Sequence, residues 1–125
     1  MSRPEAGESH APGDGGFDDP AAVRVVLVTA PDPEVAASLA REVVGSRLAA
    51  CVNLLPGVQS VYRWDGEVKE DGEVLLLIKT RHDRCEALSE RLVELHPYDV
   101  PEVLVLPAVG GSPAYLDWVC AEAAP

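Results

Sequence analysis

Apolar residues in the first third of the chain follow a strand pattern and then a helix pattern. The run from Val23 to Thr29 is rich in β-branched residues and predicts an interior strand. Asp32 follows as a helix N-cap, with Pro33 at the first helical position. Apolar residues then recur at helical spacing to Val44, and Gly45 is predicted to end the helix in the left-handed conformation.

The longest feature is a predicted β-hairpin that spans Leu48 to Thr80. Its turn is Asp65-Gly66, a dipeptide that readily takes the positive φ angles of a type I′ turn. This turn sets the strand pairing as Trp64 with Glu67, Arg63 with Val68 and Tyr62 with Lys69. Pro56-Gly57 and Asp71-Gly72 interrupt the two strands and predict a bend at each place.

The remaining elements are shorter. Val74 to Ile78 is apolar on both faces, so this part of the hairpin is predicted to be a central strand. A second helix is predicted from His82 to Leu95, with Thr80 as its cap. A buried strand from Val103 to Leu106 and a short helix from Ala114 to Ala121 complete the pattern.

This β-α-β-β-α-β order with a short C-terminal helix predicts an α+β protein with the ferredoxin-like plait. Both main helices should cover one face of a four-stranded antiparallel sheet. The other face has no helix of its own, so it is predicted to meet other subunits. The hairpin tip, which carries Tyr62, Trp64 and Val68, must lie in water or on another subunit, and we favour the second.

The composition of the chain indicates its domain organisation and the kinds of molecule that it can bind. The chain of 125 residues is predicted to form one domain, residues 22–125, preceded by a disordered acidic Gly/Pro tail, residues 1–21. A net charge of −11 disfavours nucleic acid and anionic membranes as partners, although it can also serve solubility alone.

The chain carries neither a signal peptide nor an apolar run long enough for a membrane helix. Its three cysteines form no CxxC motif. These features predict a cytoplasmic protein with reduced thiols.

The sequence carries no nucleophile elbow, Walker loop, dinucleotide fingerprint or HExxH motif, so we expect the protein to have no enzymatic activity. His96 has two interpretations of equal weight, a cap on the carbonyls of the preceding helix or a site residue. Cys51 is more simply explained by core packing than by soft-metal binding. Lys79 and Glu102 flank apolar strands, so each is expected to have a partner.

The chain from about Val23 to Val119 resembles the CutA family of divalent-cation tolerance proteins. The matching blocks are VTAPD (Val28–Asp32), RLAACVNLLPGVQSVYRWDG (Arg47–Gly66), EVLLLIKT (Glu73–Thr80), HPYDVPE (His96–Glu102) and YLDW (Tyr115–Trp118). The resemblance implies a ferredoxin-like subunit in a homotrimer whose hairpins embrace neighbouring subunits. It also implies similarity to PII-type signalling proteins, a link to copper tolerance and the response to metal ions, and no enzymatic activity.

The resemblance also implies site residues. The cleft or ligand-binding positions are Tyr62, Trp64, Glu73, Lys79, His96, Tyr98 and Glu102, and the structural motif positions are Cys51, Asn53, Pro101 and Trp118. Metal-binding members carry a cysteine and a second histidine where this chain has Val28 and Leu95. His96 alone remains of that ligand set, which implies weak binding of copper or another divalent cation.

Three functions therefore stay open. The first is a homotrimer that responds to divalent metal ions and binds them weakly. The second is a PII-like sensor in which Lys79, His96 and Trp64 bind a small anionic metabolite between subunits. The third is a structural or adaptor trimer without a small ligand.

Overall fold

The structure, a computed structural model, describes residues 16–125. The part of the predicted tail that covers residues 1–15 lies outside this range. Residues 16–21 differ from the prediction, because Gly16–Asp18 form the short 3-10 helix η1 and the Arg24 guanidinium donates to the carbonyl of Phe17. The described fold therefore begins before residue 22.

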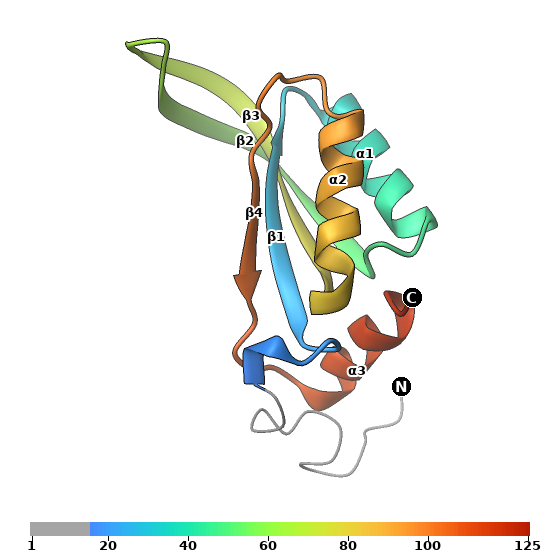
Figure 1. The fold of residues 1–125 in the computed structure, drawn as a ribbon. Helices are drawn as coiled ribbons and strands as arrows, with labels where there is room; N and C mark the ends of the chain where they lie inside the picture. The colour runs from blue at the N-terminus through green and yellow to red at the C-terminus, as the bar shows by residue number, and fades with distance from the viewer. Residues whose placement is uncertain (1–15) are drawn as a thin grey trace.

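The strands and helices follow the predicted order. They are β1 (Val23–Ala30), α1 (Pro33–Gly45), β2 (Cys51–Trp64), β3 (Glu67–Arg81), η2 (His82–Arg84), α2 (Cys85–Leu95), β4 (Val103–Pro107) and α3 (Pro113–Glu122). The strands form one antiparallel sheet in the order β2-β3-β1-β4. Helices α1 and α2 lie side by side over one face, and α3 lies near the start of β1 (Figure 1). None of the helices within residues 16–125 could cross a membrane.

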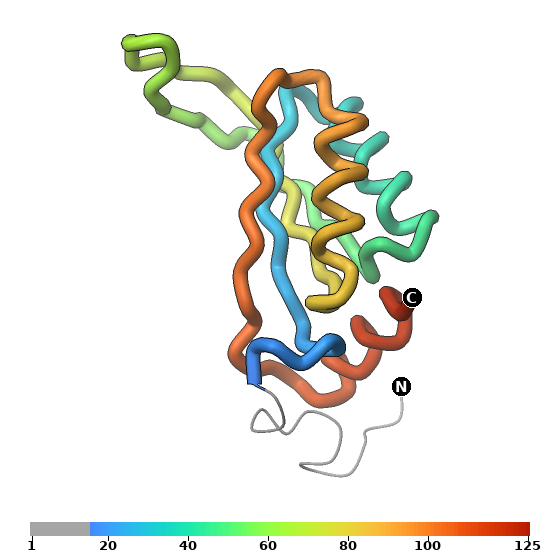
Figure 2. Tube along the Cα trace, in the orientation of Figure 1, coloured from blue at the N-terminus to red at the C-terminus, as the bar shows by residue number. Residues whose placement is uncertain are grey.

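The predicted hairpin is confirmed. Trp64 pairs with Glu67, Arg63 with Val68 and Tyr62 with Lys69. Asp65 has φ 52° and Gly66 has φ 78°, as a type I′ turn requires. The hairpin arm extends well beyond the two helices (Figure 2), so its tip gains no cover from the core of its own subunit.

One of the two predicted interruptions changes the pairing. The β2–β3 register shifts between Leu55 and Val58, where Gly57 takes φ 77°. On the other strand Asp71 and Gly72 stay in register with Ser60 and Gln59. The bulge therefore lies on β2 alone, where Pro56 has no N–H to donate to the ladder.

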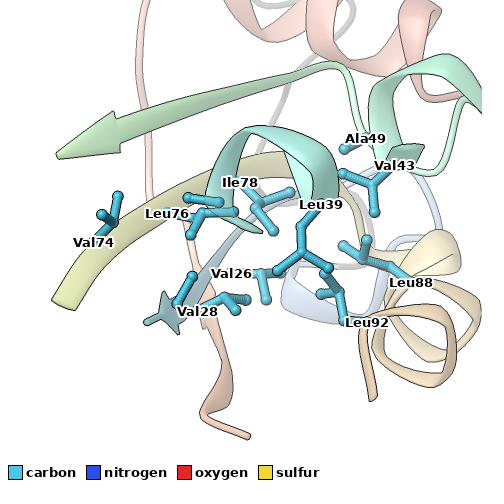
Figure 3. Close-up of a cluster of buried hydrophobic side chains, with 12 residues drawn as sticks. Val26, Val28, Leu39, Val43, Ala49, Val74, Leu76, Ile78, Leu88 and Leu92 are labelled. Carbon is cyan, nitrogen blue, oxygen red and sulfur yellow. The ribbon is translucent and has the colours of Figure 1, made fainter. Parts of the chain in front are cut away.

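The core fills the space between the sheet and the two long helices (Figure 3). Twelve buried residues form it: Val26, Val28, Ala30, Ala36, Leu39, Val43, Ala49, Val74, Leu76, Ile78, Leu88 and Leu92. Strand β3 lies between β2 and β1, which confirms the prediction of a central strand at Val74 to Ile78. The aliphatic core agrees with an aromatic content of only 5%.

The start of α1 is as predicted, but its end is not. The Asp32 side chain accepts a hydrogen bond of 2.8 Å from the backbone of Val35. Gly45 does not take a left-handed conformation; that conformation falls at Arg47, with φ 63°. The chain first makes another turn, in which the N–H of Leu48 donates to the carbonyl of Val43 over 3.0 Å. A glycine marked the region of the helix end, but the backbone hydrogen bonds decided which residue carries the positive φ.

Thr80 does not cap the second helix. Its hydroxyl donates to the carbonyl of Leu48 over 2.7 Å, and the residue is fully buried. The segment from His82 begins as the 3-10 turn η2, and α2 starts only at Cys85 without a side-chain cap. Thr80 is thus a strand residue that ties β3 to the start of the hairpin.

Replacing Leu92 by Ala should lower the free energy of unfolding by about 2–5 kcal/mol, because the side chain is fully buried between the sheet and α1. The matched control is Leu95→Ala on the same helix, where the side chain is 37% exposed, and it should cost less than about 1 kcal/mol. Urea denaturation at one protein concentration measures both. Equal losses would contradict the assignment of the core.

Candidate functional site

The face of the sheet that the helices leave uncovered is apolar. Val26 and Leu76 point into the core, so their neighbours along each strand point to the opposite side. We call this side the open face; its apolar members are Val25, Leu27, Leu55, Leu75, Leu77, Leu104 and Leu106. Leu104 is 53% exposed and Leu55 is 40% exposed. A contiguous apolar surface of this kind is typical of an interaction site.

The hairpin extends the open face. Residues paired across the ladder share a side of the sheet, so Tyr62 opposite Lys69 and Trp64 opposite Glu67 point to the same side as Leu75. Trp64 is 49% exposed. The aromatic residues of the hairpin therefore continue the apolar surface beyond the core.

A cluster of phenols and carboxylates begins at the base of the hairpin and extends along its arm to Tyr62. The Tyr62 hydroxyl donates to the Asp71 carboxylate, and the Tyr98 hydroxyl donates to the Glu73 carboxylate over 2.9 Å. Burial, together with this bond to Glu73, raises the pKa of Tyr98, and the bond to Asp71 raises the pKa of Tyr62. We call these four residues the tyrosine–carboxylate cluster. Both phenols keep their protons and hold the two carboxylates in place.

The ring of His96 packs against the Tyr98 side of this cluster. Its ring lies 4.6 Å from the ring of Tyr98, and the residue is only 7% exposed. Its Nε2 lies 2.7 Å from the carbonyl oxygen of Thr29, so this nitrogen donates. Its Nδ1 accepts a 3.1 Å bond from the backbone N–H of Tyr98. Both ring nitrogens are therefore engaged, so the ring does not cap the α2 carbonyls, but His96 is the C-cap residue of α2 and its backbone N–H donates to the carbonyl of Leu92 over 2.9 Å.

A second polar cluster surrounds Lys79 at the other end of the open face. Cys51 on β2 lies directly opposite Lys79 on β3, with 3.9 Å between sulfur and Nζ. The ammonium also donates to the side-chain carbonyl of Asn53. The Tyr115 hydroxyl lies 3.5 Å from the Cys51 sulfur, and the Tyr115 ring lies 5.8 Å from that of Trp118. We call these five residues the Lys79 cluster.

Cys51 is therefore not a core residue. It is half-buried on the open face, where α3 supplies its neighbour Tyr115. The hydrogen bond with Cys51 and partial burial together raise the pKa of Tyr115 to about 12. The sequence interpretation failed because Ala50 and Val52 flank the thiol in sequence, whereas the strand turns alternate residues to opposite faces.

The two clusters are separate within one chain. Lys79 pairs with Val25, whereas Thr29, which accepts the hydrogen bond from His96, pairs with Leu75. Four residues along a strand correspond to about 13 Å. Lys79 and His96 therefore cannot hold one small ligand together in the same subunit.

The other predicted site residues are spread out. Trp64 lies near the hairpin tip, Glu102 is exposed and Pro101 is half-buried. The expected partner is confirmed for Lys79, which donates to Asn53 and Cys51, although within residues 16–125 neither Lys79 nor Glu102 forms an ion pair. The exposure of Glu102 removes the cost of its unpaired charge. In the same described range no three His, Cys, Asp or Glu residues gather closely enough to hold a metal ion.

Two cluster members were not predicted as site residues. Asp71 is a diagonal neighbour of Tyr62, because Ser60 lies directly opposite Asp71. The predicted hairpin register contained that signal, since diagonal cross-strand neighbours can interact. Tyr115 is different, because only the packing of α3 against the sheet brings it to Cys51.

Comparison with known proteins gives a consistent result. Residues 24–122 match the family described as CutA1 divalent ion tolerance protein. "Divalent-cation tolerance protein CutA" of Thermus thermophilus is 54% identical over 95 residues, covering 76% of this chain and 92% of that protein. "Protein CutA" of Mus musculus is 47% identical over 116 residues, covering 93% of this chain and 61% of that longer relative.

Solved structures agree in fold. The divalent cation tolerance protein from Thermus thermophilus matches with a TM-score of 0.76 and 52% identity, covering 78% of this chain and 94% of that one. CutA1 from Oryza sativa matches with a TM-score of 0.79 and 46% identity, covering 81% of this chain and 93% of that one.

Replacing Cys51 by Ala should move the titration midpoint of Tyr115 from about 12 toward the ordinary value near 10. Because folding raises this pKa, the protonated hydroxyl stabilises the fold fully below about pH 10, and that contribution is lost as the pH rises through about 12. Tyrosinate absorbance measures the midpoint in a Tyr62→Phe, Tyr98→Phe background. Cys85→Ala, the control, should leave the midpoint unchanged; an unchanged midpoint in Cys51→Ala would contradict the contact.

Proposed function

This chain belongs to the CutA1 divalent ion tolerance protein family, and we propose on that basis that it is a non-enzymatic homotrimer that contributes to divalent-cation tolerance. The observation that carries the proposal is the apolar open face and its continuation along the hairpin. A monomer would leave Leu55, Leu104 and Trp64 in water.

Assembly of identical subunits accounts for this surface. The strand order β2-β3-β1-β4 is consistent with the ferredoxin-like plait, in which one sheet face is free to pack on other copies. The hairpin arm reaches beyond its own core and carries aromatic residues that are frequent interface anchors. Three copies arranged with open faces inward would bury both features, as the resemblance to CutA and PII-like proteins implies.

Weak cation binding is assigned to the tyrosine–carboxylate cluster. Asp71 and Glu73 present carboxylate oxygens, which can bind divalent cations including zinc, and the bonds from Tyr62 and Tyr98 orient them. Binding of copper by His96 stays a prediction, and such binding would cost the ring one of its two hydrogen bonds. The ring would have to give up its bond to Thr29 or to the Tyr98 backbone, so any affinity should be low.

We also place the protein in the cytoplasm. Its three cysteines are all free, which is consistent with a reducing compartment. Some relatives carry other compartments in their names, since the Arabidopsis thaliana protein is called chloroplastic and the Archaeoglobus fulgidus structure is titled periplasmic.

A second candidate function is a PII-like sensor of a small anionic metabolite. The observation that favours it is Lys79, a half-buried cation without an ion pair in the described range. Its site would be the Lys79 cluster without His96, because the two residues lie at opposite ends of the open face.

Replacing Leu77 by Glu should convert the assembly to monomers, because an unpaired carboxylate buried in an apolar interface costs several kcal/mol. Sedimentation at micromolar concentration should show about three chains for the original protein and one for the variant. Val93→Glu, at a position on α2 that is 52% exposed, is the control and should stay assembled. A monomeric original protein, or an assembled Leu77→Glu variant, would contradict the proposed interface.

Removing one carboxylate of the cluster should weaken cation binding. Calorimetric titration of Zn(II) and Cu(II) into Glu73→Gln, in a His10→Ala background, should show at least about tenfold lower affinity than the background protein. Glu67→Gln, near the hairpin tip, is the matched control and should bind normally. Binding that survives in Glu73→Gln but is lost in His96→Ala would place the metal on the imidazole instead.

A further inference from the structure

A groove runs between α1 and α2 on the helix side of the molecule, away from the open face. Its volume is about 480 Å³, which lies in the range of small-molecule sites in proteins. Residues of α1 line it together with the end of α2 and the loop that follows. These segments meet because the two helices lie side by side, with the start of α1 next to the end of α2 (Figure 1). No member of the open face or of its two polar clusters lines this groove.

Much of the groove is apolar. Leu39 is buried in the core, and Val35 packs against that core. Leu95 and Pro97 line the groove from the end of α2 and the following loop. Leu95 is 37% exposed, so part of this apolar lining is in contact with water. A ligand with an aliphatic body would remove that surface from water, which favours binding.

The polar part of the lining includes a cation without a partner. Glu42 is engaged, because Arg91 donates to its Oε2 atom over 3.2 Å. Arg41, by contrast, forms neither an ion pair nor a hydrogen bond with any of residues 16–125. Ser38 lies one helical turn before Arg41 and adds a hydroxyl to the lining. A guanidinium and a hydroxyl, both able to donate to an oxyanion, thus lie beside an apolar surface.

Few arginines of the chain are in this situation. Arg63 on the hairpin arm is the other one in the described range that has neither kind of contact. The remaining arginines of residues 16–125 contact a backbone carbonyl or a carboxylate: Arg24, Arg47, Arg81, Arg84 and Arg91. Because Arg41 lines the groove and Arg63 lies on the arm, Arg63 provides a control of equal charge.

We propose that this groove binds a small amphipathic carboxylate, a molecule with an aliphatic body of several carbons and one carboxylate head. The head accepts from the Arg41 guanidinium, which can offer two parallel N–H bonds, and from the Ser38 hydroxyl. The aliphatic body lies against Leu39 and Leu95. This site is on the opposite side of the sheet from the open face, so it is independent of the assembly and the cation binding proposed above.

NMR titration of the isotope-labelled full chain provides the test. The probes are hexanoate, hexylamine and hexanol, which share one aliphatic body and differ in the head group, each added at constant ionic strength. Hexanoate should give saturable shifts of the Ser38 and Leu95 signals, with a Kd on the order of 1 mM for so small a ligand. Hexylamine and hexanol should bind at least about fivefold more weakly, and Arg41→Gln should weaken hexanoate binding by a similar factor.

Arg63→Gln removes an equal charge, and this control should keep the Kd of the original protein. Leu95→Ala, which is expected to cost little stability, should also weaken hexanoate binding because it removes apolar lining. The proposal is overturned if hexanoate gives no saturable shift, or if hexylamine or hexanol binds as tightly. It is equally overturned if Arg41→Gln or Leu95→Ala leaves the Kd unchanged. The sedimentation of Leu77→Glu and the cation titration of Glu73→Gln are unaffected by any of these results.

Discussion

The register of the β2–β3 ladder is the constraint on which the rest of the molecule depends. The shift between Leu55 and Val58 moves every β2 residue before it by one position against β3. A continuous ladder from the Asp65-Gly66 turn would place Val52, not Cys51, opposite Lys79. Because side chains alternate between the two faces, that slip would turn Cys51 toward the helices and break up the open face.

With the bulge in place, the two central strands, β1 and β3, contribute side chains to both faces of the sheet. The residues of β1 and β3 that point toward α1 and α2 form a closed aliphatic core, while their neighbours form the apolar open face. Polar side chains lie at the two ends of that face. The tyrosine–carboxylate cluster lies on the hairpin, and Lys79 lies at the end beside α3. Association through the open face would therefore bring both polar clusters to the edges of the interface, so assembly and ligand binding would affect one another.

His96 shows that a residue type alone does not define a role. A histidine between a helix and a proline-stiffened loop has the chemistry of a metal ligand. Here its two nitrogens connect β1 to the loop before β4, through the Thr29 carbonyl and the Tyr98 amide. Its ring also supports the phenol that holds Glu73. In one subunit the His96 ring thus holds Tyr98 against β1, and ligation of a metal by this ring would have to compete with these bonds.

Local signals were sufficient at three places, although the end of α1, which also depends on local backbone bonds, was misplaced from Arg47 to Gly45. The β-branched run of β1, the Asp32 cap and the Asp65-Gly66 turn each depend on residues close in sequence, and the structure confirms all three. Asp71 beside Tyr62 could also have been found from the predicted register. Tertiary structure alone decided what depends on residues far along the chain: the bond from Thr80 to Leu48 and the meeting of Tyr115 with Cys51. In these cases the partner is a carbonyl or side chain brought near only by packing, and no spacing along the chain encodes that distance.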